Sequence, residues 1–116
     1  MHELPVIQSI LDIVLNHARM NQVSRVHSIA LAIGELSDLQ DEWLQRYFDY
    51  ISKGTIAEGA RLVIERTPVK LKCANCAKEI SVKPAEMKDI ICPECKSREL
   101  TLIAGREYFI KSMEAQ

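Results

Sequence analysis

The chain has 116 residues, of which 47% are hydrophobic and 27% charged, a size that suits one compact unit or one core with a small appended module. The net charge of −1 is unevenly spread, with 5 basic and 9 acidic residues before position 66 and 10 basic and 7 acidic residues from there on. This mild basic excess is far below that of typical nucleic-acid-binding domains. Charges interrupt every apolar run, and no basic region opens the chain, so we expect neither a membrane span nor a signal peptide. The sequence therefore predicts a cytoplasmic protein that binds neither nucleic acid nor membrane.

The first two predicted elements are a helix and a strand. Residues 3–21 carry apolar side chains at helical spacing, and Pro5 suits the first helical turn, where its missing N–H would have no partner. The helical stripe consists of Val6, Ile7, Ile10, Leu11, Val14, Leu15 and Ala18. Residues 24–34 then alternate larger and smaller side chains, which predicts a strand.

A second helix and two further strands follow. Ser37 or Asp38 could cap the helix at its start, and Gly54 could end it. Its apolar stripe is Leu39, Trp43, Leu44, Tyr47, Phe48 and Ile51. The pattern of residues 60–68 predicts a second strand. The pattern of residues 100–113 predicts a hairpin that turns at Gly105, and we expect its last arm to rejoin the sheet.

These elements predict an α+β fold in which two helices pack on a small β-sheet, with an inserted four-cysteine zinc-ribbon module. We expect residues 1–69 plus about 105–116 to form the α+β body and residues 70–104 to form the zinc ribbon. The segment between the two cysteine pairs has too few apolar residues for a core of its own, so we expect a metal to order it.

Four cysteines carry the strongest chemical signal. Cys73 and Cys76 form one C-x2-C turn, and Cys92 and Cys95 form a second one fifteen residues later. This spacing is typical of a four-cysteine zinc site, in which all four positions around the metal are filled, and such a zinc is structural. Two disulfides, a single iron held by the same ligands, and a redox-active cysteine pair are less favoured alternatives, the first because cytoplasmic thiols stay reduced.

No catalytic motif is recognisable, and we do not expect an enzyme. The carboxylates of Asp38, Asp41 and Glu42 are expected to complement the dipole of the second helix. His17 and His27 have no Cys, His or Asp partner at ligand spacing, so we interpret both as structural.

Four motifs in series resemble the HypA/HybF family of nickel-handling hydrogenase maturation factors. They are "MHEL" at the start, "AIGELS" after the first strand, "GTIAEGARLVIE" before the ribbon, and the paired "CANC" and "CPEC" turns. The resemblance implies a metallochaperone that binds Ni(II) at His2, with Glu3 beside it, and holds zinc through Cys73, Cys76, Cys92 and Cys95. Some relatives have a histidine near the second cysteine pair, whereas this chain has none after His27.

The resemblance also implies partners. Nickel would pass to the large subunit of [NiFe]-hydrogenase with the help of the GTPase HypB, since this chain has no phosphate-binding loop of its own. Urease maturation proteins are further candidate partners, because some relatives also serve urease. The sequence leaves a homodimer open.

The N-terminus suits square-planar Ni(II), which favours nitrogen donors in one plane. The Met1 amine, the deprotonated amide of His2 and the His2 imidazole would close adjacent chelate rings, and the amide or carboxylate of Glu3 could fill the fourth position. The alternative function is a zinc-ribbon binding module for protein or nucleic acid, in which His2 has no role. Nickel bound in a His2-dependent way would distinguish the two.

Overall fold

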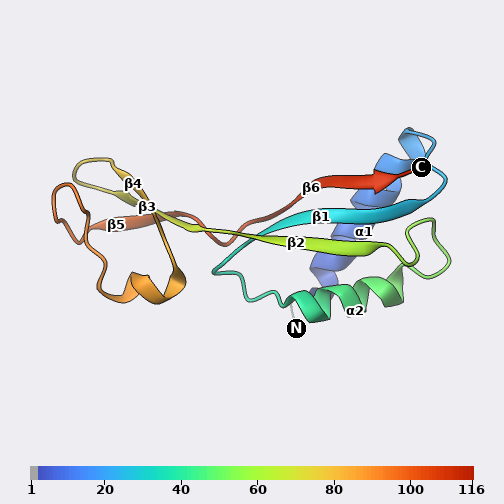
Figure 1. Ribbon diagram of the computed structural model, residues 1–116, viewed down its shortest axis with the longest axis horizontal. Helices are drawn as coiled ribbons and strands as arrows, with labels where there is room; N and C mark the ends of the chain where they lie inside the picture. The colour runs from blue at the N-terminus through green and yellow to red at the C-terminus, as the bar shows by residue number, and fades with distance from the viewer. Residues whose placement is uncertain (1–2) are drawn as a thin grey trace. The chain divides into compact units, whose positions relative to one another are not determined.

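The computed structural model describes residues 3–116, which form two three-stranded sheets, two α-helices and one short 3₁₀-helix (Figure 1). In chain order the elements are α1 (Glu3–Met20), β1 (Val26–Gly34), α2 (Asp41–Ile51), β2 (Arg61–Thr67), β3 (Val69–Cys73), β4 (Glu79–Val82), the 3₁₀-helix η1 (Pro84–Asp89), β5 (Leu100–Ala104) and β6 (Tyr108–Ala115). The strand orders are β2-β1-β6 and β4-β3-β5.

The chain divides into two compact units. Of the described residues, the first unit contains 3–32, Asp38–Glu65 and Phe109–Gln116, and the second contains Ile33–Ser37 and Arg66–Tyr108. The predicted domain boundaries at 69/70 and at about 104/105 stay a prediction.

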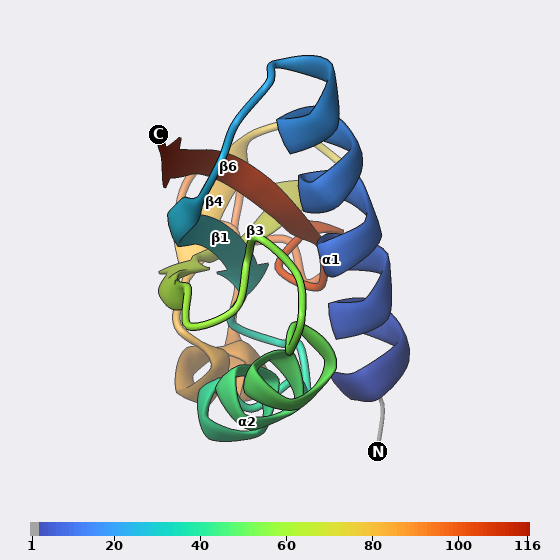
Figure 2. The same ribbon diagram turned by 90° about the vertical axis from the view of Figure 1, so that its right-hand side faces the viewer.

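The first unit has its core where α1 packs on the sheet. The helical stripe predicted for residues 3–21 is confirmed: Ile7, Ile10, Leu11, Val14 and Ala18 are buried, while Val6 and Leu15 lie at its margins. In Figure 2, α1 covers one face of the sheet, and its N-terminal end lies beside α2. The alternation predicted for residues 24–34 is also confirmed, because the larger side chains Ile29, Leu31 and Ile33 of β1 are all buried.

The start of α2 differs from the prediction. The helix begins at Asp41, its N-cap is Gln40, and no side chain of Gln40 caps it. Ser37 and Asp38 lie too far upstream to be its N-cap, so that prediction is wrong. At its other end the helix stops at Ile51, and Gly54, with a φ of +80°, turns the chain three residues later.

The predicted hairpin of residues 100–113 is also wrong in its pairing. β5 pairs with β3 in the second unit's sheet, whereas β6 is the edge strand beside β1 in the other sheet. Gly105, with a φ of +135°, turns the chain from one sheet to the other rather than closing a hairpin. The expectation that the last arm rejoins the sheet of β1 is confirmed.

The second unit has a small apolar core, to which the segment between the two cysteine pairs contributes Val82 and three partly buried side chains. Val69, Leu71 and Val82 are buried together. The partly buried side chains packed against them are Leu36, Ile80, Met87, Ile90, Leu100 and Leu102. Antiparallel pairing of β3 with both β4 and β5 brings these side chains together, although few of them are close in the sequence.

Candidate metal centre

The four cysteines lie on two turns of the same construction. Cys73 ends β3 and Cys76 lies in the turn that follows, while Cys92 and Cys95 lie between η1 and β5. In the first turn the Ala77 N–H donates to the Cys73 carbonyl at 2.9 Å, and in the second the Lys96 N–H donates to the Cys92 carbonyl at 2.8 Å.

Both turns place the residue after the second cysteine in the left-handed region, with a φ of +65° at Ala77 and +61° at Lys96. This conformation is uncommon for residues other than glycine. It closes each turn tightly, so that the two sulfurs of a pair face the same point. Alanine and lysine, the residue types at positions 77 and 96, do not indicate this conformation, so it could not be predicted from the sequence.

The four sulfurs form one compact cluster. All four Sγ atoms lie within 4.8 Å of one another. Between the two turns, Cys73 Sγ lies 3.5 Å from Cys95 Sγ and Cys76 Sγ lies 3.4 Å from Cys92 Sγ. A tetrahedron with Zn–S bonds of about 2.3 Å has sulfurs about 3.8 Å apart. The sulfurs are free thiols in a donor set that fits zinc.

Neighbouring groups shift the pKa values of three of these thiols. The backbone N–H of Lys78 acts to lower the pKa of the Cys76 thiol, but its contacts with Cys92 and the other thiols, together with desolvation, raise that pKa to about 12. Hydrogen bonds from the Cys95 backbone to Cys92 and from the Asn75 side chain to Cys95 lower the pKa values of those two thiols. A divalent cation bound among the four sulfurs would favour their deprotonated forms.

Two of the four cysteines of the cluster are buried and two are exposed. Cys73 and Cys92, the first cysteine of each turn, are buried, whereas Cys76 and Cys95 are exposed. Among residues 3–116 these cysteines are the only group of three or more His, Cys, Asp or Glu side chains placed to hold a metal ion.

The predicted nickel residues are only partly described. Met1 and His2 lie outside the described residues. Glu3 is the first residue of α1, and the residue is buried, with 8% of its surface exposed. Its Oε2 accepts a hydrogen bond of 3.2 Å from the backbone N–H of Gln40. This contact could not be predicted from the sequence, because 37 positions separate the two residues and no local pattern links them.

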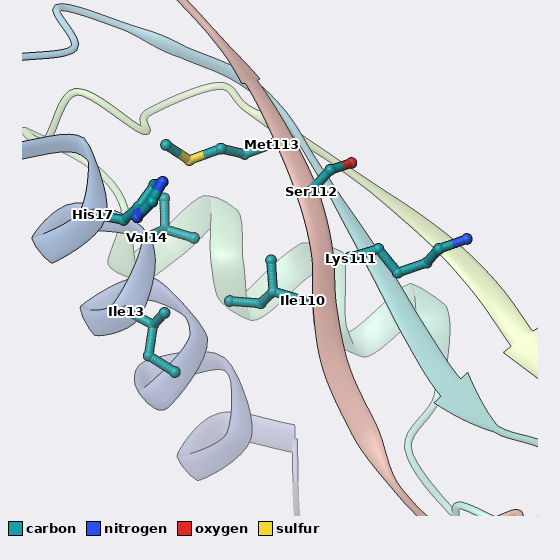
Figure 3. A pocket seen from close by; sticks show the side chains of 7 residues that line it. All are labelled: Ile13, Val14, His17, Ile110, Lys111, Ser112 and Met113. Carbon is teal, nitrogen blue, oxygen red and sulfur yellow. The ribbon is translucent and has the colours of Figure 1, made fainter. Parts of the chain in front are cut away.

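The two other histidines are exposed. His27 lies on β1, and His17 lies on α1. Figure 3 shows His17 beside a groove of about 280 Å³ between α1 and β6, with the side chains of His17 and Met113 facing one another across it. The remaining lining residues are Ile13, Val14, Ile110, Lys111 and Ser112, so the groove is mainly apolar.

A family model described as hydrogenase/urease nickel incorporation metallochaperone HypA matches residues 1–115. The chain belongs to the HypA family. The hydrogenase maturation factor HypA of Aquifex aeolicus is 34% identical over 116 residues, which cover 100% of this chain and 98% of that protein. HypA of Trichodesmium erythraeum is 41% identical, and the match covers 100% of this chain and 96% of that protein.

Solved HypA structures share the fold. A solution structure of HypA protein has a TM-score of 0.79 at 26% identity, covering 100% of this chain and 97% of that one. The solution structure of the Ni metallochaperone HypA from Helicobacter pylori has a TM-score of 0.70 at 24% identity, covering 99% and 97%. As a HypA chain, this protein is a nickel metallochaperone of hydrogenase maturation, and its four-cysteine cluster is able to hold zinc. No helix in the described part of this HypA chain is long and apolar enough to cross a membrane.

Proposed function

We propose that this chain binds Ni(II) at its N-terminus and delivers the ion to the large subunit of [NiFe]-hydrogenase. The observation that carries the proposal is the match to a nickel-incorporation family over residues 1–115, which includes the N-terminal histidine. In this proposal His2 is the principal nickel residue, with Met1 and Glu3 beside it. The protein is a carrier and not an enzyme.

The local structure supports an N-terminal chelate. α1 begins at Glu3, and Pro5 occupies its first turn. The first four N–H groups of a helix have no partner within that helix, so metal binding by a backbone amide at this point breaks no helical hydrogen bond. The Met1 amine, the His2 amide and the His2 imidazole supply the nitrogen donors that square-planar Ni(II) favours.

The zinc has a structural role in this proposal. Cys73, Cys76, Cys92 and Cys95 occupy all four positions of a tetrahedral site, so no position remains for a substrate or for nickel. Bound zinc joins the two turns and adds to the stability that the apolar cluster around Leu71 provides.

Delivery requires partners. We propose that the GTPase HypB regulates nickel release, because the sequence has no phosphate-binding loop. The family description names urease beside hydrogenase, which supports urease maturation proteins as further partners. We place the protein in the cytoplasm, and a homodimer is compatible with this function.

The deciding experiment is nickel titration of untagged protein. Wild-type protein is expected to bind one nickel per chain at the N-terminus, and His2→Ala is expected to lose this binding without unfolding. His27→Ala is the matched control, because His27 is exposed on β1 and lies in the same unit. Affinity should fall as pH falls through the titration range of the imidazole and the amine, since both donors must be unprotonated.

Two outcomes would contradict the proposal. The first is a His2→Ala protein that binds nickel with wild-type affinity. The second is a protein that binds only zinc, which would favour the zinc-ribbon binding module instead. An N-terminal tag should weaken nickel binding, and a C-terminal tag should leave it unchanged, because only the former removes the free amine.

A further inference from the structure

The two edges of the first unit's sheet differ in how their backbone groups are covered. In the order β2-β1-β6, the edge strands are β2 and β6. At the start of β2, the Gln45 side chain of α2 donates to the Ala60 carbonyl at 3.3 Å and accepts from the Leu62 N–H at 2.8 Å. A neighbouring strand would engage alternate residues in the same pattern. The side chain of Gln45 therefore covers this part of the β2 edge.

The edge of β6 has no such cover in the part of the chain that the structure describes. Among residues 3–116, β1 is the only strand that pairs with β6, and no side chain hydrogen-bonds to the backbone of residues 109–114. Successive residues of a strand direct their N–H and C=O groups to opposite sides, so that alternate residues of β6 face away from β1. An edge of this kind can pair with another chain, and for that reason proteins commonly protect it.

Helix α1 presents apolar surface beside this open edge. The groove of about 280 Å³ lies between α1 and β6, and the side chains of Ile110 and Met113 point into it from the strand (Figure 3). On the helix side, Ile13 lines the groove and is nevertheless 56% exposed. Val6, Ile13 and Met20 follow one another at intervals of seven residues, so they lie along one side of the helix. The apolar surface of α1 is therefore wider than the part that the three strands cover.

One added strand would satisfy both features. Beside β6 it would pair the open backbone groups, and its side chains on the helix side would fill the groove and cover Ile13. A helix bound at the same place would also cover Ile13, but it would leave the backbone groups of β6 without strand partners. The open edge therefore favours an extended segment as the occupant.

The charges around the groove indicate the composition of that segment. Of the seven lining residues, His17 and Lys111 are basic and none is acidic. In Figure 3 the side chain of Lys111 points away from α1, and its Nζ lies 2.6 Å from the carboxylate of Glu65 on β2. Opposite charges on neighbouring strands attract when they share a face of the sheet. An acidic residue beside Lys111, with apolar residues alternating on the helix side, is therefore the favoured pattern.

We propose that the open edge of β6, together with the groove beneath α1, is a docking site for an extended segment of a partner protein. The segment adds to the sheet as a fourth strand, with alternate apolar side chains against Ile13 and an acidic side chain beside Lys111. The site contains neither the four cysteines nor the N-terminal residues, so this proposal does not depend on the proposed nickel site.

The first arm of the test adds the synthetic peptide acetyl-Thr-Val-Glu-Val-Thr-Val-Thr-amide to the isotope-labelled full chain in its zinc-bound form. Amide signals of residues 109–114 should shift saturably, and their hydrogen exchange should slow, because backbone groups at the edge become paired. The same peptide with proline at its central position should not bind, since proline lacks the N–H and does not fit a paired strand. A peptide with lysine in place of glutamate should bind about fivefold more weakly, because like charges then face one another at Lys111.

The second arm changes the protein. Ile13→Ser should weaken peptide binding about tenfold, because the peptide then covers a polar side chain, and the variant should stay folded because Ile13 is mainly exposed. Val63→Ser is the matched control and should bind as the wild type does, since Val63 is a similarly exposed apolar residue (51%) on the other edge strand.

Three results would overturn the proposal. The first is the absence of saturable shifts at peptide concentrations up to about 1 mM. The second is a set of shifts on β2 in place of β6, or an equal loss of binding in Val63→Ser. The third is a concentration-dependent shift of residues 109–114 without any peptide, abolished by Ile13→Ser, which would show that a second copy of this chain occupies the edge.

Discussion

Gly34 and Gly105 pass each other so closely that a Cβ atom on Gly34 would lie 2.1 Å from the carbonyl carbon and oxygen of Gly105. Two backbone hydrogen bonds hold this crossing. The Leu36 N–H donates to the Gly105 carbonyl at 2.8 Å, and the Gly34 N–H donates to the Glu107 carbonyl at 2.8 Å. Within the second unit, these backbone contacts join the end of β1 to the segment between β5 and β6.

Gly34→Ala should therefore be strongly destabilising. The new methyl group meets backbone atoms, which cannot rotate away as a side chain can, and we expect a loss of about 3 kcal/mol in the free energy of unfolding. Urea denaturation with zinc held constant measures this change. Gly54→Ala is the control, because the space around Gly54 is open and only its positive φ opposes a side chain. It should cost about 1 kcal/mol, and an equal cost at both positions would contradict the steric explanation.

Glu107 should make stability fall at acid pH. Its carboxylate accepts hydrogen bonds from the N–H groups of Gly105 at 2.7 Å and Arg106 at 3.0 Å and from the Thr67 hydroxyl at 3.3 Å. These donors, the Gly105 N–H foremost, lower the pKa of Glu107 below its ordinary value of 4.5. A carboxylate with a lowered folded-state pKa stabilises the protein above 4.5, and this contribution is lost as pH falls through the folded-state pKa.

The measurement compares the unfolding free energies of wild type and Glu107→Gln between pH 7 and pH 3. The difference should be largest at neutral pH and should shrink below pH 4.5, where the wild-type carboxyl also becomes neutral. A difference that stays constant over this range would show that the charge of Glu107 contributes nothing.

Ser52→Ala should leave stability unchanged or increase it. Ser52 is fully buried after the last turn of α2, and its hydroxyl has no hydrogen-bond partner. Removing an unsatisfied buried hydroxyl can stabilise a protein by about 1 kcal/mol. Thr55→Ala is the contrasting variant, because the Thr55 hydroxyl donates to the Ser52 carbonyl at 2.6 Å and accepts from the Ala57 N–H at 3.1 Å. Thermal unfolding should show opposite shifts for the two variants, and a destabilised Ser52→Ala would reveal a partner for the hydroxyl.

Cys73→Ser should remove zinc and loosen the second unit while leaving the helices of the first unit folded. Cys73 is buried at the end of β3, and its sulfur lies 3.5 Å from that of Cys95. Zinc content and residue-resolved amide exchange check this, with faster exchange expected in β3, β4 and β5 and unchanged exchange in α1. Ser81→Ala, an exposed change on β4, is the control. Full retention of zinc in Cys73→Ser would exclude the shared four-cysteine site, and global unfolding would show that the unit is not separable.

The elements that depend on local periodicity could be predicted from the sequence. The burial of Ile7, Leu11 and Val14 follows from their 3.6-residue spacing, and the burial of Ile29 and Leu31 follows from strict alternation. The four-cysteine cluster could also be predicted, because each C-x2-C turn needs only its own residues to present two sulfurs.

The strand pairing and the hydrogen-bond partner of the Gln40 N–H depend on contacts between residues far apart in the chain. Residues 100–113 read equally well as a hairpin, but burial of Leu100 and Leu102 against β3 assigns β5 to one sheet, and β6 joins β1 in the other. The backbone N–H of Gln40, the N-cap residue of α2, donates to the Glu3 carboxylate, which lies 37 positions away in sequence. Local patterns report which face of an element is apolar. Contacts between distant residues, such as Glu3 with Gln40, arise only when burial of those faces brings the elements together.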